Sequence, residues 1–170
     1  MSVLDEELFR VIADGAEAES PLWGESLRPD ARREPDPVFS RLVPDERFVL
    51  GLETIYEGYL LHYGRPRLFD PPDDDVALLL GDALLAHGLV RIAETGATGA
   101  VADLGELLAL CAQGRADGLD GDGAAWAATA ALLDREVLER CRVALEHLAR
   151  ATVGDGRVDE ALAAHSARLR

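Results

Sequence analysis

Two acidic and two basic residues between positions 51 and 67, "GLETIYEGYLLHYGRPR", are the side chains best suited to bind an ion. Glu53 and Glu57 lie four residues apart, and Arg65 and Arg67 follow them. Residues four apart share one face of a helix. Paired carboxylates can hold Mg²⁺ beside phosphate oxygens, and arginine can bind phosphate through two hydrogen bonds. The stretch could therefore be a site for a metal and a diphosphate.

Three interpretations of the acid pair remain open at this point: a solvated pair on a helix rim, residual metal binding, or a salt bridge to a partner protein. The solvated pair is the simplest, although Leu50, Leu60 and Leu61 flank it and indicate that the face is not wholly in water. We accordingly predict no metal and no cofactor. Glu53 and Glu57 are weak candidates for metal ligands, and the sequence offers no stronger ones. Mg²⁺ is expected only if the protein still binds diphosphate.

A fifth candidate, Asp82, falls among leucines of an apolar helix. A buried carboxylate needs hydrogen-bond partners or a cation. Asp82 is therefore predicted either to meet a backbone amide, hydroxyl or arginine of a neighbouring helix or to lie near a polar cavity in the bundle. Cys111 and Cys141 are expected to be buried free thiols, because they lack the spacing of a zinc site. The four histidines show no spacing typical of a ligand set.

Composition places the chain among globular proteins and restricts its partners. It has 170 residues, of which 48% are hydrophobic and 29% charged, as in a soluble domain. The net charge of −15 disfavours binding to nucleic acid and to anionic membrane surfaces. We find no uninterrupted apolar run of the roughly 20 residues that cross a bilayer and no basic, apolar leader at the start. The expectation is a cytoplasmic protein without a transmembrane segment.

Hydrophobic periodicity predicts an all-α helical bundle of about five to six helices. We expect an N-terminal helix and proline-rich arm over residues 1–44, followed by a helical bundle over residues 45–170, in a single globular domain. The arm should lie on the core through Trp23, Phe39 and Leu42; a disordered linker is the alternative. The helices are predicted to span residues 3–17, 45–63, 74–95, 99–113, 124–152 and 158–169.

The predicted helix over residues 74–95 is apolar around most of its circumference. His87, Arg91 and Glu94 form one polar stripe, and small or apolar residues fill almost all of the rest. Such a helix is covered on several sides. Gly81 weakens it by roughly 1 kcal/mol relative to alanine, which indicates that close helix contact compensates. We predict a partner interface that includes Leu78, Leu80, Leu84, Leu85, Leu89 and Ile92.

Residues 53–113 resemble the trans-isoprenyl diphosphate synthase (polyprenyl synthetase) family. In that family a helix with a D-D-x-x-D motif precedes an R-R-G-[KR]-P turn and a helix containing L-A-G-D. Here "YGRP" matches the turn and "LLLGDALLA" the following helix, without a gap. The same register places residues 53–57, "ETIYE", on the aspartate-rich motif. The resemblance covers about a third of the chain and implies half of an isoprenoid-synthase fold.

The departures from the family pattern imply a protein that has lost catalysis. Thr54 replaces the middle aspartate, and His62 and Tyr63 replace the paired arginines. No second aspartate-rich motif follows residue 113. The chain resembles the small component of two-part prenyl diphosphate synthases, which pairs with a catalytic subunit. The resemblance implies a dimer interface on the helices over 74–95 and 99–113, as a homodimer or a heterodimer. A stand-alone helical scaffold is the alternative, and a Mg²⁺-dependent prenyltransferase is a third.

Overall fold

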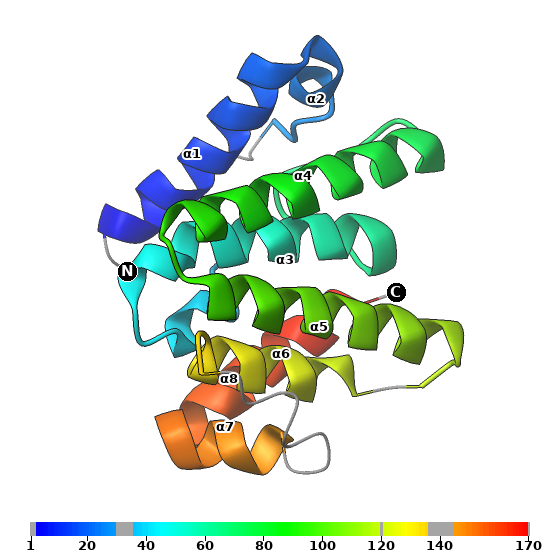
Figure 1. The fold of residues 1–170 in the computed structure, drawn as a ribbon. Coiled ribbons are helices and arrows are strands. Elements are labelled where there is room, and N and C mark those ends of the chain that lie inside the picture. The colour runs from blue at the N-terminus through cyan, green and yellow to red at the C-terminus, as the bar shows by residue number, and fades with distance from the viewer. Residues whose placement is uncertain (1–2, 30–35, 120, 136–144, 170) are drawn as a thin grey trace.

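The computed structural model describes residues 3–29, 36–119, 121–135 and 145–169. Across these residues all regular secondary structure is helical and no strand is present, which confirms the all-α bundle. Figure 1 shows the helices stacked from α1 and α2 at one end to α7 at the other. Their bounds are α1 Val3–Glu19, α2 Pro21–Glu25, α3 Val49–Tyr63, α4 Asp74–Glu94, α5 Thr98–Ala116, α6 Asp122–Leu132, α7 Leu145–Val153 and α8 Asp155–Ser166.

Local signals fix both ends of α4 as predicted, but Gly64 does not end α3 in the way expected. Asp73 caps α4 by accepting a hydrogen bond from Val76 N at 2.8 Å. Gly96 ends the α4 region with a φ of 80°, which a glycine adopts without strain. Gly64 is not the left-handed stop that we expected after α3, because its φ is −142°. It instead continues in extended backbone and forms a bridge to Leu169.

The single helix predicted over residues 124–152 is wrong. Helix α6 ends at Leu132, and Asp134 has a positive φ of 69°. The side chain of buried Asp103 on α5 accepts a hydrogen bond from Asp134 N at 3.0 Å. This tertiary bond satisfies a backbone donor outside the helix, which periodicity along the chain cannot reveal. Residues 136–144, with Cys141, lie outside the described residues.

Helices α3 and α4 run antiparallel and meet through two pairs of glycines. Gly51 and Gly58 on α3 face Gly88 and Gly81 on α4, with a spacing of seven residues in each helix. A Cβ added at Gly58 would lie 2.8 Å from Gly81 O, and one at Gly88 would lie 2.8 Å from Gly51 O. The glycines therefore let the two backbones approach more closely than any side chain would permit. The close contact expected at Gly81 is present.

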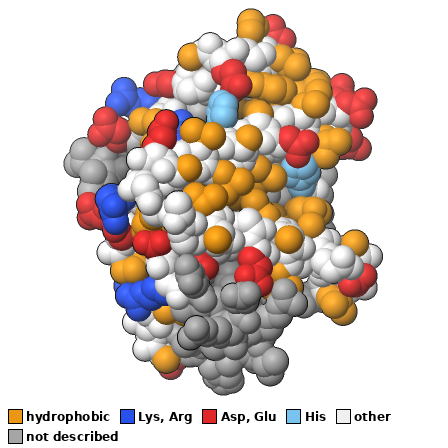
Figure 2. All heavy atoms as spheres, in the orientation of Figure 1, with side chains coloured by type: hydrophobic (Ala, Val, Ile, Leu, Met, Phe, Trp, Pro, Cys, Tyr) orange, Lys and Arg blue, Asp and Glu red, His pale blue; other side chains and the backbone are white. Residues whose placement is uncertain are grey.

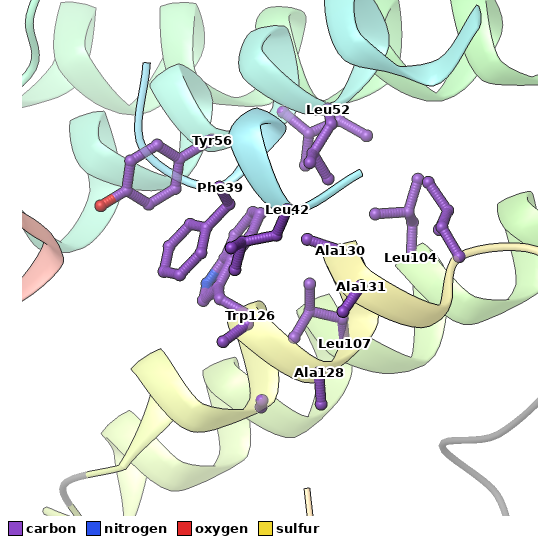
Figure 3. Packing of buried hydrophobic residues seen from close by; sticks show 14 of the residues in the cluster. Phe39, Leu42, Leu52, Tyr56, Leu104, Leu107, Trp126, Ala128, Ala130 and Ala131 are labelled. Carbon is purple, nitrogen blue, oxygen red and sulfur yellow. The ribbon is translucent and has the colours of Figure 1, made fainter. Parts of the chain in front are cut away.

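The arm before α3 contributes directly to the core. Phe39 is fully buried, and its ring stacks on that of Trp126 from α6 with the centroids 5.5 Å apart. Figure 3 shows these two rings beside Leu42, with Tyr56 of α3 on the other side of Phe39. Trp23 packs, half-buried, against a second cluster in which α1 lies on α3 and α4. The predicted contacts of Trp23, Phe39 and Leu42 are confirmed, while residues 30–35 lie outside the described part.

Candidate functional site

Glu53 is held in the protein interior by three donors. Its Oε1 accepts hydrogen bonds from Val38 N and Ser40 N, both at 3.2 Å, and its Oε2 accepts one from Arg67 Nη1 at 2.6 Å. Helix α3 supplies the carboxylate, and the backbone of the arm supplies two of the donors. Glu53 therefore fastens the arm onto α3.

Glu57, one turn later on α3, is bound in the same manner by the segment after Gly64. Its Oε1 accepts hydrogen bonds from Arg67 N and Leu68 N, both at 2.7 Å, and its Oε2 accepts one from Arg67 Nε at 2.8 Å. We call Glu53, Glu57 and Arg67 the Arg67 triad. All three side chains are at most 1% exposed.

Aromatic rings and charge complete the environment of Arg67. Its guanidinium lies 4.8 Å from the ring centroid of Phe9 and 5.1 Å from that of Tyr56, within the range of cation–π attraction. Burial alone would lower the pKa of Arg67, but the adjacent Glu53 and Glu57 raise it above its ordinary value. Arg67 thus remains a buried cation whose charge is compensated by two carboxyl groups.

The acid pair does not fit a magnesium site. Each of its four carboxyl oxygens already accepts at least one hydrogen bond from the protein, whereas Mg²⁺ needs free oxygen ligands in near-octahedral geometry. A guanidinium also occupies the position between the two carboxylates. Within the described residues no group of three or more His, Cys, Asp or Glu side chains could hold a metal ion.

The interpretation of Glu53 and Glu57 as a solvated rim pair is therefore wrong. The pair forms a salt bridge, but inside the chain rather than to a partner. The flanking leucines were the correct signal for burial. Arg67, considered above as a possible phosphate ligand, is instead the internal counter-ion.

Arg65 and Asp82 lie apart from the triad. Arg65 is exposed and donates from Nη2 to Ala167 O, so it helps to hold the C-terminal segment. Asp82 is not buried among leucines as predicted: its side chain is 67% exposed and one oxygen lies 3.2 Å from His62 Nε2. The five candidate residues do not form one site, because only Glu53, Glu57 and Arg67 come together.

A second cluster of largely buried polar side chains was not predicted from the sequence. It consists of Tyr56, Tyr59, Arg115, Asp122 and His165, which we call the His165 cluster. Tyr56 Oη lies 2.8 Å from His165 Nδ1, and His165 Nε2 lies 3.2 Å from Asp122 Oδ1. Asp122 Oδ2 accepts hydrogen bonds from Tyr59 Oη and, at 2.6 Å, from Arg115 Nη2. The cluster ties α8 to α3, α5 and α6.

Sequence spacing could not reveal this cluster, because its members come from four helices and are separated by up to 109 positions. The cluster holds helices together: His165 is 2% exposed and Tyr56 is fully buried, so neither side chain is accessible to a substrate. Burial alone would raise the pKa of Asp122, but contacts from His165, Tyr59 and Arg115 lower it well below its ordinary value.

Replacing Asp122 with asparagine is expected to destabilise the protein at neutral pH and much less in acid. A carboxylate with a lowered pKa stabilises the folded state above the unfolded pKa of about 3.9. That contribution is lost progressively as the pH falls below this value. The gap between the urea midpoints of wild type and Asp122→Asn should therefore narrow from pH 6 to pH 2.5. A gap that stays constant with pH would contradict the role of the ionised carboxylate.

The predicted interface residues on α4 divide into two sets. Leu80, Leu84 and Ile92 are buried in the chain's own core, so they cannot contact a partner as we expected. The reason is that the chain's own helices cover this side of α4: Leu80 and Leu84 pack in the second cluster with residues of α1, and Ile92 lies against Gly51 of α3. Leu85 and Leu89 are half-buried against the core, and Leu78 is 52% exposed.

One side of α4 nevertheless remains apolar and uncovered. Leu78, Leu79 and Val90 are 52%, 57% and 54% exposed, and at 100° per residue they fall within one third of the helix circumference. Figure 2 shows hydrophobic side chains gathered across this part of the surface, with acidic and histidine side chains around them. We call these three residues, together with exposed Asp75, Asp82 and Ala86 of the same side, the α4 face.

By length and composition α4 is also long and apolar enough to cross a membrane, with 33% of its most apolar window buried in the protein. Core helices of soluble proteins meet the same criterion. The absence of a transmembrane segment remains a prediction from the sequence.

No family model, curated protein or solved structure matches the chain.

Proposed function

We propose that the chain is a non-catalytic, polyprenyl-synthase-like helical protein that acts as a partner or regulatory subunit of a prenyl diphosphate synthase. The observation that carries this proposal is the Arg67 triad. The resemblance aligns Glu53 and Glu57 with the family's first metal-binding motif, and in this chain both carboxylates bind Arg67 and backbone amides. They are not free to hold Mg²⁺ against a diphosphate.

A second observation supports action through protein contact. The α4 face exposes Leu78, Leu79 and Val90 on a helix that the resemblance assigns to a dimer interface. Burying a leucine is worth roughly 1.5–3 kcal/mol, so several on one helix can stabilise an association. A stand-alone interaction protein would use the same face, and only its partner would differ.

The test combines the purified chain with the catalytic subunit of a long-chain prenyl diphosphate synthase, Mg²⁺ and isopentenyl and allylic diphosphates. The chain alone should form no prenyl product. Added to the catalytic subunit, it should alter the product chain length or the rate at least about twofold, and the Leu79→Asp variant should not. Condensation by the chain alone would show an enzyme. No effect on any catalytic subunit, with the chain folded, would refute the pairing and favour the stand-alone interaction protein.

A further inference from the structure

The α4 face carries charge of one sign only. Asp75 lies one turn before Leu78 and Leu79, and Asp82 lies one turn after them, with its side chain 67% exposed. Glu94 is exposed at the end of the helix. Two carboxylates therefore lie within the apolar surface rather than at a distance from it.

The arginines of α4 and α5 are engaged elsewhere, and the basic group beside Asp82 is a histidine, His62. Arg91 on α4 donates from Nη1 to Thr54 Oγ1 at 2.7 Å, away from the exposed side. Arg115 on α5 is bound to Asp122. His87 is paired with Glu19 at 3.3 Å, and His62 Nε2, on a side chain 13% exposed, lies 3.2 Å from Asp82 Oδ1. Residues 74–117 contain seven Asp and Glu residues against two arginines, with no lysine.

From this arrangement we infer that the α4 face docks an amphipathic helix of a different protein, whose apolar stripe is bordered by arginine or lysine. The inference rests on the proposed function and specifies the chemistry of the partner. The apolar stripe would cover Leu78, Leu79 and Val90, and the basic border would meet Asp75 and Asp82. Charge pairs of this kind set partner choice and association rate.

A second copy of the chain fits the face less well. Two α4 faces packed on each other would place Asp75 and Asp82 of both copies in one interface, and the face itself holds no arginine or lysine to pair with them. Like charges opposed across an interface cost several kcal/mol, and a chain with a net charge of −15 adds long-range repulsion. Charge complementarity therefore favours a basic heterologous helix.

The experiment titrates the full chain with two synthetic amphipathic helices that share one leucine stripe, one bordered by arginine and the other by glutamate. Fluorescence anisotropy at 150 mM salt measures both Kd values, and light scattering measures the oligomeric state. We expect the arginine peptide to bind at least about tenfold more tightly, the equivalent of 1.4 kcal/mol, to a monomeric chain.

Three variants separate docking from general attraction between a basic peptide and an acidic protein. Leu79→Asp adds a negative charge and removes apolar contact, so docking predicts at least about tenfold weaker binding, whereas diffuse attraction predicts tighter binding. Asp75→Asn/Asp82→Asn should weaken binding about fivefold or more, in proportion to two lost charge pairs. Asp155→Asn/Asp159→Asn removes the same charge from exposed positions on α8 and should change the Kd less than about twofold.

Each contrary result has a distinct meaning. Equal binding of both peptides, or tighter binding by Leu79→Asp, would overturn the inference. A homodimer that Leu79→Asp dissociates would show that a second copy occupies the face, and would leave the proposed function standing. The proposed function fails on the separate assay with catalytic subunits, whichever peptide binds.

Discussion

Replacing Arg67 with methionine is expected to lower the free energy of unfolding by about 3–5 kcal/mol, the range measured when one partner of a buried ion pair is removed. Methionine keeps much of the side-chain volume but leaves Glu53 and Glu57 buried without their counter-ion. Two carboxylates in the protein interior would then have to take up protons or draw in water. Urea denaturation followed by circular dichroism at pH 7 measures the loss.

A matched control separates burial from charge. Arg10 pairs with Glu7 at 3.3 Å on the surface, where the two side chains are 56% and 61% exposed. Such pairs contribute only about 0–1 kcal/mol, so Arg10→Met should have little effect. The triple variant Glu53→Gln/Glu57→Gln/Arg67→Met should recover part of the stability, because no unpaired charge remains. Equal effects of Arg67→Met and Arg10→Met would contradict the structural role of the triad.

The Arg67 triad shows how far sequence reasoning could reach at the candidate site. The spacing of Glu53 and Glu57 correctly placed both on one side of one helix. It could not decide between water and the protein interior, because the deciding donors come from other segments: Val38 and Ser40 in the arm, and Arg67 after the turn. Contacts between side chains that are distant along the chain produce no periodic pattern in the sequence.

The same distinction explains the successes and failures in the fold. Helix α4 was predicted almost to the residue, since Asp73 and Gly96 are local signals at its two ends. The helix predicted through residues 124–152 failed because α6 ends at Leu132, beside a tertiary hydrogen bond from Asp134 N to Asp103, thirty-one positions earlier. Leu80 and Leu84 were assigned to a partner because the sequence does not show that α1 packs against α4.

Of the four glycines where α3 and α4 meet, Gly88 is the one whose added Cβ would come closest to another atom. Gly88→Ala is expected to lower the free energy of unfolding by about 3 kcal/mol, the upper end of the usual range for overpacking. Its Cβ would lie 2.3 Å from Ile55 Cγ1, 2.8 Å from Gly51 O and 2.9 Å from Ile55 N. Two of these atoms belong to the backbone of α3, so a rotamer change cannot relieve the clash, and the two helices must separate. Urea denaturation gives the loss.

Two further glycines test whether close backbone approach, rather than helix propensity, causes the loss. All three positions lie inside helices, and alanine gains about 1 kcal/mol of propensity over glycine at each of them. A Cβ at Gly105 on α5 meets nothing within 4 Å, so Gly105→Ala should raise stability by about 0.5–1 kcal/mol. At Gly81 the closest atom is His62 Nε2, 2.7 Å away at the end of a side chain, and the nearest backbone atom, Gly58 O, is 3.3 Å away. Gly81→Ala should therefore fall between the other two. If Gly88→Ala proved as stable as Gly105→Ala, the two helices could not be as close as the glycine pairs place them, and α3 would no longer account for the burial of Ile92 beside Gly51.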